Sequence, residues 1–354
     1  MTKKVKPLVT ICVIFLFLYI FLAATPLAKE LQFIPQWTIP VVLSDIKPEE
    51  KNFEDAIPFR FGQNLGYFTK DKQILSYITF PYKAAVSENV WTVYSQDSTS
   101  VKLYSPSGTL SGEIKESGFP YLHEDRIFNF LPGGASFSRC SESGEILWRY
   151  ETYAPITAFS SAECGTAVGL ADGNIAVLDN DGKTVLEFAP GGSTYPVILG
   201  TALSDSGKYI ACVSGQDNQR FTLGINDKGH IKVLYHKFLE NQSTKQLLIK
   251  FSRNEEYVFY AYNGGIGIVD IPEAKGASIN IKGDVLSIKE SKDEKIVFIL
   301  SRDHGTYIVS AIEPFKNYAG SFSFTAGTAF IEVRDNFLFV GKDDTISMLK
   351  IVHK

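Results

Sequence analysis

The chain has 354 residues, of which 45% are hydrophobic, 13% aromatic and 21% charged. This composition is typical of a packed globular protein with a sizeable core, and the many aromatic side chains favour strands. Without Lys3, Lys4 and Lys6, 32 of the 35 basic residues remain against 39 acidic ones. The body is therefore mildly anionic, and nucleic acid is excluded as an expected partner.

The N-terminus combines these lysines with an uncharged run from Pro7 to Ala24, which predicts a transmembrane helix within residues 1–24. The length of the run fits both a retained anchor and a cleaved signal. Pro26 stands where cleavage after Ala28 would require a small side chain, so a retained anchor is favoured and a cleaved signal is the alternative. The lysines before the run predict a body on the extracytoplasmic side, periplasmic or extracellular, attached to the lipid bilayer by one helix.

Residues 25–58 are predicted to form an extended tether. Five prolines occur in this stretch, at positions 26, 35, 40, 48 and 58, and a charged segment lies among them. Because proline lacks a backbone donor, this density argues against a helix. Trp37 and the apolar run Ile39–Leu43 are the parts of the tether able to dock on the body.

Residues 59–354 repeat short strands separated by turns. Five turns end in glycine, which readily adopts the positive φ of tight hairpins. These glycines are Gly108, Gly144, Gly182, Gly229 and Gly276, at intervals of 36, 38, 47 and 47 residues. The regular spacing indicates one structural unit used repeatedly.

A second series of strands follows the same spacing and is almost wholly apolar, so it is expected in the interior. Its members lie at Val90–Tyr94, Arg126–Phe130, Thr166–Leu170, Tyr209–Val213, Tyr257–Tyr262, Ile296–Leu300 and Phe337–Gly341. Four strands per roughly 40 residues predict the blade of a β-propeller. The seven members predict an all-β, seven-bladed β-propeller.

The last blade has only three strands before the chain ends, so the N-terminal side is expected to supply its outer strand and close the ring. Gln73–Phe80 is predicted to be that strand. An eight-bladed ring is the alternative, in which Ile57–Phe61 and the hairpin Gly66–Phe80 form an incomplete blade of their own.

The segments Gly144–Tyr150 and Ala171–Phe188 resemble the PQQ-like repeat, in which a strand ending in Asp leads through a glycine turn to a G-x-x-x-W strand. They also resemble WD40-type blades, as does Ala202–Gly215. Quinoprotein dehydrogenases with this repeat hold their quinone and calcium with adjacent cysteines, which this chain lacks, so no cofactor is expected. The chain is more similar to the envelope-assembly propeller of this group, which has no active site.

Catalytic, cofactor-binding and metal-binding residues are not expected. The "DNDG" turn, Asp179–Gly182, lacks the further ligands of a calcium loop and is interpreted as a hairpin turn. The histidines show no metal-ligand spacing and are expected at the surface; they are His123, His230, His236, His304 and His353. Outside the apolar run, three cysteines lie on separate expected strands and are interpreted as buried apolar side chains; they are Cys140, Cys164 and Cys212.

Two connections are the best candidates for partner binding. Phe188–Gly200 is an unusually long link between an outer strand and the next inner strand, and Ser214–Phe221 is a polar tip. Loops on a rigid ring are free to vary, and an arginine offers directional donors. The predicted partner-binding residues are Ser193, Thr194, Tyr195, Gln219 and Arg220.

These observations favour a non-catalytic scaffold for protein–protein interaction, tethered to the membrane as a monomeric propeller, with cell-envelope assembly as the expected process. Its expected partners are other envelope or membrane proteins. The alternatives are an enzyme with a site in the central funnel and a sensor that binds a small ligand there.

Overall fold

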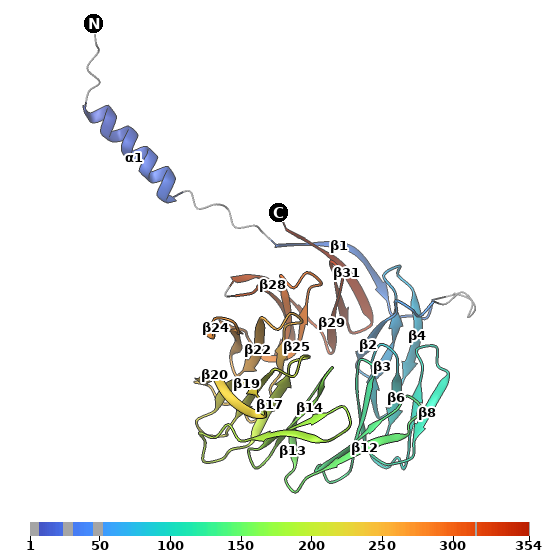
Figure 1. Ribbon diagram of the computed structural model, residues 1–354. Coiled ribbons are helices and arrows are strands. Elements are labelled where there is room, and N and C mark those ends of the chain that lie inside the picture. Colours follow the sequence, from blue (N-terminus) through green and yellow to red (C-terminus); the bar gives the residue numbers. More distant parts are fainter. Residues whose placement is uncertain (1–6, 24–30, 45–51, 316, 354) are drawn as a thin grey trace.

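The computed structural model describes residues 7–23, 31–44, 52–315 and 317–353, and its body is a ring of β-sheets (Figure 1). The described residues form eight sheets, of which seven have four strands and one has three. Seven of the sheets are antiparallel meanders of consecutive strands, and the eighth adds a strand from the N-terminal side. The body is therefore an eight-bladed β-propeller, with blades numbered in chain order.

The first four blades have the following strands. Blade 1 contains β2 (Ile57–Phe61), β3 (Asn64–Phe68) and β4 (Ile74–Thr79); blade 2 contains β5 (Lys83–Val86), β6 (Trp91–Tyr94), β7 (Val101–Tyr104) and β8 (Leu110–Ile114); blade 3 contains β9 (Phe119–His123), β10 (Arg126–Phe130), β11 (Ser136–Cys140) and β12 (Ile146–Glu151); blade 4 contains β13 (Ile156–Ala162), β14 (Gly165–Leu170), β15 (Ile175–Asp179) and β16 (Thr184–Phe188).

The last four blades complete the ring. Blade 5 contains β17 (Ile198–Leu203), β18 (Tyr209–Ser214), β19 (Arg220–Asp227) and β20 (His230–Phe238); blade 6 contains β21 (Ile249–Phe251), β22 (Tyr257–Tyr262), β23 (Gly265–Asp270) and β24 (Lys275–Asn280); blade 7 contains β25 (Asp284–Glu290), β26 (Val297–Asp303), β27 (Thr306–Glu313) and β28 (Asn317–Thr325); blade 8 contains β29 (Ala329–Arg334), β30 (Phe337–Lys342), β31 (Thr345–His353) and β1 (Leu31–Pro40).

The prediction of seven blades is wrong, and the eight-bladed alternative is correct. The segment Gln73–Phe80, predicted to close the last blade, contains β4, which pairs with β3 inside blade 1. The outer strand of blade 8 is β1, whose partner is β31 from Leu31↔His353 to Pro40↔Thr345. Closure from the N-terminal side was thus predicted correctly, but with the wrong strand.

Strand β1 lies inside the stretch that the sequence assigns to a tether. It tolerates Pro35 and Pro40 because it is the outermost strand of its sheet, where one edge needs no partner. A bulge between Pro35 and Trp37 shifts the register with β31. The proline-rich composition therefore marks an edge strand of the propeller in this part of the stretch.

The strands of blade 1 correspond to the second, third and fourth strands of the other blades. Thr69 N, in the turn between β3 and β4, donates to Gln73 O at 2.9 Å. The same turn precedes the outer strand of blades 2 and 3, and the register shift just before it, between Tyr67 and Phe68, recurs in the third–fourth strand pairs of those blades. No strand of the described residues takes the first position. Across this position, Arg334 of blade 8 forms an ion pair with Glu88 of blade 2.

The hydrophobic core lies between neighbouring blades, because each sheet is covered on both faces. The second strands are buried along most of their length, and every residue of β14 is buried. This explains why these strands are uninterrupted apolar runs in the sequence. Between blades 3 and 4 the core is aromatic, and the ring of Phe159 lies 5.0 Å from that of Phe128 and 5.2 Å from that of Phe137 in edge-to-face geometry.

Helix α1 (Pro7–Ala23) has 17 residues, and its side chains from Ile11 to Tyr19 are exposed. No helix in the described part of the chain is both long and apolar enough to cross a membrane. At about 1.5 Å per residue, α1 is shorter than the ~30 Å hydrocarbon core of a bilayer. The predicted N-terminal transmembrane helix is therefore contradicted and replaced by a shorter apolar helix.

The connections between strands lie on two opposite faces of the ring. Since successive strands run in opposite directions, the turns after the first and third strand positions share one face, which we name the hairpin face. The connections after the second and fourth positions share the other, which we name the loop face. The two candidate sites described below lie on different faces.

Candidate functional site

The loop face carries all five residues predicted to bind a partner, and the structure brings them together around blade 5. The side chain of Asp217 accepts hydrogen bonds from Ser193 Oγ, from Thr194 N at 3.3 Å and from Tyr195 N at 3.1 Å. These bonds, first that from the Ser193 hydroxyl, lower the pKa of Asp217 to about 2. Asp217, which sequence reasoning did not select, thus fixes the loop that precedes β17.

Arg220 and Gln219 also form hydrogen bonds to neighbouring loops of the loop face. Arg220 Nη2 donates to the carbonyls of Pro190 and Gly191, the latter at 3.0 Å. Gln219 is fully buried and donates from Nε2 to Ser243 O at 3.0 Å, while its Oε1 accepts from Ser243 N at 3.0 Å. Both side chains link loops to one another within the propeller.

Tyr195 is the member of the predicted set that projects from this fixed loop, with 63% of its surface exposed. Two other connections from an outer strand to the next blade also carry exposed tyrosines: Tyr82 is 66% exposed and Tyr153 is fully exposed. The loop face therefore presents large amphipathic side chains from three blade connections, and at least the Tyr195 loop is held rigidly.

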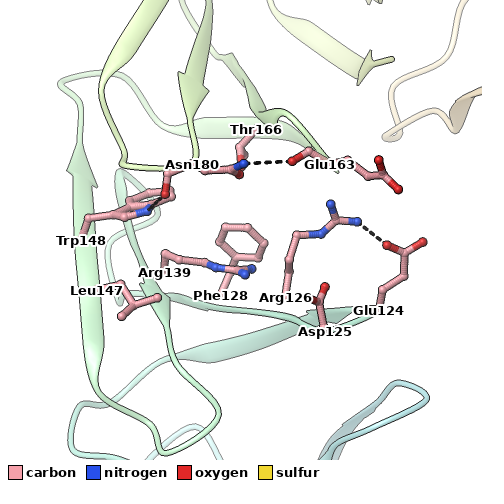
Figure 2. Close-up of a pocket in the computed structure, with 10 residues that line it drawn as sticks. All are labelled: Glu124, Asp125, Arg126, Phe128, Arg139, Leu147, Trp148, Glu163, Thr166 and Asn180. Atoms are coloured by element: carbon pink, nitrogen blue, oxygen red, sulfur yellow. Dashed lines mark hydrogen bonds and ion pairs between the residues drawn. The ribbon is translucent and has the colours of Figure 1, made fainter. Parts of the chain in front are cut away.

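The hairpin face contains a cleft of about 430 Å³ between blades 3 and 4 (Figure 2). Ten residues line it: Glu124, Asp125, Arg126, Phe128, Arg139, Leu147, Trp148, Glu163, Thr166 and Asn180. Its wall is braced by Asn180, whose Nδ2 donates to Glu163 O at 2.9 Å and whose carbonyl accepts from Trp148 Nε1 at 2.8 Å. The cleft is thus enclosed by groups fixed to one another across two blades.

Two guanidinium groups occupy this cleft. Arg126, only 8% exposed, donates from Nη2 to Glu124 Oε2 at 2.5 Å and contacts His123 Nδ1 at 3.0 Å. Its Nε is buried and has no acceptor in the described part of the chain. Arg139 lies over the ring of Phe128, at 4.9 Å from the centroid, and its buried Nη1 also has no acceptor among the described residues.

The charges of these groups follow from their surroundings. Burial lowers the pKa of Arg139, although the carboxylate of Asp125 opposes the shift. Burial also lowers the pKa of His123, which therefore favours its neutral form more than an exposed histidine does. His123 was predicted to lie at the surface, but it is half-buried beside Arg126.

Sequence reasoning missed this cleft. Arg126 belongs to a strand noted for its apolar residues, and Arg139 to a strand noted only for Cys140. Nothing in their spacing shows that they share a cleft with Glu163 of the next blade. The sequence contains one indication of the cleft, which is the arginine at the first position of the otherwise apolar strand β10. A buried charge requires a partner or a ligand.

The cysteines agree with the prediction of buried apolar side chains at two of three positions. Cys140 and Cys212 are buried, and burial raises their thiol pKa to about 11 and about 12. Cys164 is partly exposed, and its Sγ lies 3.5 Å from Ser204 O. Within the described ranges, no group of three or more His, Cys, Asp or Glu residues is arranged to hold a metal ion.

Comparisons with known proteins agree with this architecture. A family model described as beta-propeller protein matches residues 1–354. An uncharacterized protein of Treponema pallidum (strain Nichols) is 30% identical over 346 residues, which cover 96% of this chain and 92% of that protein. The crystal structure of BamB from Moraxella catarrhalis matches with a TM-score of 0.60 and 12% identity, over 90% of this chain and 100% of that one.

At this identity the similarity to BamB concerns the fold alone. The resemblance to β-propellers predicted from the repeats is confirmed, and the chain belongs to the beta-propeller protein family.

Proposed function

We propose that the chain is a non-catalytic scaffold that binds another protein through its loop face, and that it does so in the cell envelope. The observation that carries the proposal is the Tyr195 loop, which holds an exposed tyrosine in one position through the hydrogen bonds of Asp217. A loop that is ordered before binding loses little conformational entropy when a partner docks. The resemblance of the repeats to the envelope-assembly propeller supports the envelope role.

Tyrosine suits this role because its ring offers a large apolar area and its hydroxyl a hydrogen bond, and it is enriched among the residues that dominate protein interfaces. Tyr153 and Tyr195 stand on successive blade connections, after blades 3 and 4. A partner that covered both rings would bury two such side chains at once. The expected partner is an envelope protein with apolar or aromatic residues at its contact surface.

The N-terminal region supports a position at the membrane. The exposed side chains of α1 from Ile11 to Tyr19 include no charged residue, and such a surface favours contact with lipid. We therefore propose that the scaffold contacts a membrane surface of the envelope through this apolar segment.

The interaction is tested by crosslinking in intact cells and mass spectrometry of the recovered proteins. The double variant Tyr153→Ser/Tyr195→Ser is expected to recover at least ~10-fold less of a partner than the unmodified chain, since each interface tyrosine commonly contributes ~1 kcal/mol or more. Tyr318→Ser on β28, where Tyr318 is 47% exposed, is the matched control. Equal recovery from the double variant and the control would contradict the proposal.

The location is tested separately with a protease added to cells whose outer layers have been opened but whose cytoplasmic membrane is intact. The propeller is expected to be accessible to the protease, to sediment with membranes, and to be released when residues 7–23 are deleted. A propeller protected from the protease would place it in the cytoplasm and exclude the envelope role, whatever the crosslinking experiment finds.

A further inference from the structure

We infer that the cleft between blades 3 and 4 binds an organic carboxylate carried on an apolar group, with the guanidinium of Arg139 as its principal partner. The cleft lies on the hairpin face, opposite the exposed tyrosines, so this inference does not depend on the proposed scaffold function. It rests on the position of two arginines, the nature of the wall and the distribution of acidic residues around the rim (Figure 2).

Among the ion pairs of the described residues, none includes Arg139. Its guanidinium is stacked on Phe128, 4.9 Å from the ring centroid, and its buried Nη1 has no hydrogen-bond acceptor among the described residues. A buried donor without an acceptor is destabilising, so such groups are unusual in folded proteins. A carboxylate entering the cleft would provide acceptors for the planar guanidinium fork.

Arg126 adds a second guanidinium nearby. Its Nη2 donates to Glu124, but its Nε has no acceptor among the described residues, and its side chain is only 9% exposed. Figure 2 shows its guanidinium turned toward Glu124, and Arg126 lines the same cleft as Arg139. Two cations around one space favour an anionic ligand over a neutral one.

The rim restricts which anion enters. Glu124, Asp125 and Glu163 are exposed at the edge of the cleft, while the two arginines lie deeper. The three formal negative charges of the rim exceed the two positive charges inside. Phosphate groups carry nearly two charges near pH 7 and would be repelled more strongly than a carboxylate, which carries one. The rim therefore favours a monoanion.

The wall supplies contacts for the apolar part of the ligand. Trp148, Leu147 and Phe128 line the cleft, and Leu147 is 58% exposed although it is apolar. A volume of about 430 Å³ lies within the range of small-molecule sites. This carboxylate has two possible sources, a free organic acid or the C-terminal residue of a peptide, and both present the same group to Arg139.

The experiment measures binding by titration calorimetry, with the fluorescence of Trp148 as a reporter inside the cleft. The other tryptophans, Trp37 and Trp91, lie in blades 8 and 2. The probes are phenylacetate against phenylacetamide, N-acetyl-Ala-Phe against its C-terminal amide, and inorganic phosphate. The two acids are expected to bind and to change the Trp148 emission, while the amides and phosphate are expected to bind at least ~10-fold more weakly.

Variants assign the binding to the cleft. Arg139→Met is expected to weaken binding of the acids by about 10- to 100-fold, and Arg139→Lys by a smaller factor, because lysine keeps the charge but not the fork. Arg149→Met is the matched control, since Arg149 lies on the adjacent strand β12 and is not among the residues of the cleft. Circular dichroism verifies that each variant is folded.

Each result is decisive. Binding of either acid that requires Arg139 supports the inference, and the acid that binds more tightly identifies the source as a free acid or a peptide terminus. Absence of binding by both acids overturns it, as do equal affinities for acids and amides or equal losses in Arg139→Met and Arg149→Met. If Arg139→Met does not fold, unchanged affinity in Arg139→Lys overturns the bidentate role of the guanidinium.

Discussion

The indole Nε1 of Trp148 donates to the backbone carbonyl of Asn180 at 2.8 Å and so links the outer strand of blade 3 to a turn of blade 4. Trp37 makes the equivalent link at the closure of the ring, where its Nε1 donates to Lys70 O at 3.1 Å. Lys70 lies in the turn between β3 and β4, which corresponds to the turn that holds Asn180. Two tryptophans far apart in the sequence thus join neighbouring blades in the same way.

This equivalence predicts local effects of Trp37→Phe and Trp148→Phe. Each substitution removes one hydrogen bond, which typically contributes ~1 kcal/mol, while it keeps most of the aromatic packing. Amide hydrogen exchange is expected to accelerate in β1 and β31 for Trp37→Phe, and in the β11–β12 and β15–β16 hairpins for Trp148→Phe. Each variant serves as the control for the other. Identical exchange profiles in the two variants would show that the links are not local.

Ring closure by β1 predicts a sharp difference between two truncations. Removal of residues 1–23 leaves β1 paired with β31 and is expected to leave the Tm of the propeller unchanged. Removal of residues 1–40 also removes β1, uncovers the edge of β31 and exposes the apolar surface that Phe33 and Trp37 cover. An uncovered edge strand promotes association between chains.

The measurement is thermal unfolding together with size-exclusion chromatography. The longer truncation is expected to have a lower Tm and to elute as larger species, whereas the shorter one is expected to behave as the intact propeller does. Equal Tm values for the two truncations would show that β1 contributes little to closure.

The repeated fold was largely predictable because hairpin glycines and buried second strands leave a periodic pattern. The blade count was not, because the second-position strand of blade 1, β2, reads "IPFRF" and carries a proline and an arginine between its apolar residues. In β3, Gly66 is required by space, since a Cβ would lie 2.0 Å from Ser76 O. The closing strand β1 was missed because its prolines, which an outermost strand tolerates, resemble a tether in the sequence.

The candidate sites were predictable only in part, because their contacts join distant residues. Ser193 and Arg220 were selected as parts of two separate loops, yet Asp217 ties the loops together and was not recognised as their link. The cleft of Arg126 and Arg139 depends on which blades are neighbours and how their turns face each other. Spacing along the chain does not contain that information, whereas sheet pairing in the folded protein does.

Asp335 predicts a pH-dependent contribution to stability. Its carboxylate forms ion pairs with Lys70 of blade 1 and, at 2.9 Å, with Lys292 of blade 7. Hydrogen bonds from these lysines, first that from Lys70, lower the pKa of Asp335 to about 2. Because this folded-state value lies below the unfolded value of ~3.9, the stabilisation is present above about pH 4 and is lost as the pH falls toward 2.

Asp335→Asn tests this contribution, because Asn also tolerates the φ of 52° at this position. The side chain of Asp335 is 43% exposed, so solvent screening limits the effect to roughly 0.5–1 kcal/mol. Urea unfolding at pH 7 and pH 3 is expected to show a smaller difference between variant and unmodified chain at pH 3. A difference that does not shrink at lower pH, or that is insensitive to high salt, would exclude an electrostatic origin.

Asp217 predicts that the order of the Tyr195 loop can be changed without touching the tyrosine. Asp217→Ala removes the acceptor shared by Ser193 Oγ, Thr194 N and Tyr195 N, so amide exchange in residues 189–197 is expected to accelerate while the rest of blade 5 stays protected. If the loop is ordered for binding, the variant is also expected to recover less crosslinked partner, because the partner must then order the loop itself. Asp227→Ala on the β19–β20 hairpin of the same blade is the matched control. Faster exchange with unchanged partner recovery would show that loop order is not used in binding, and unchanged exchange would show that Asp217 does not fix the loop.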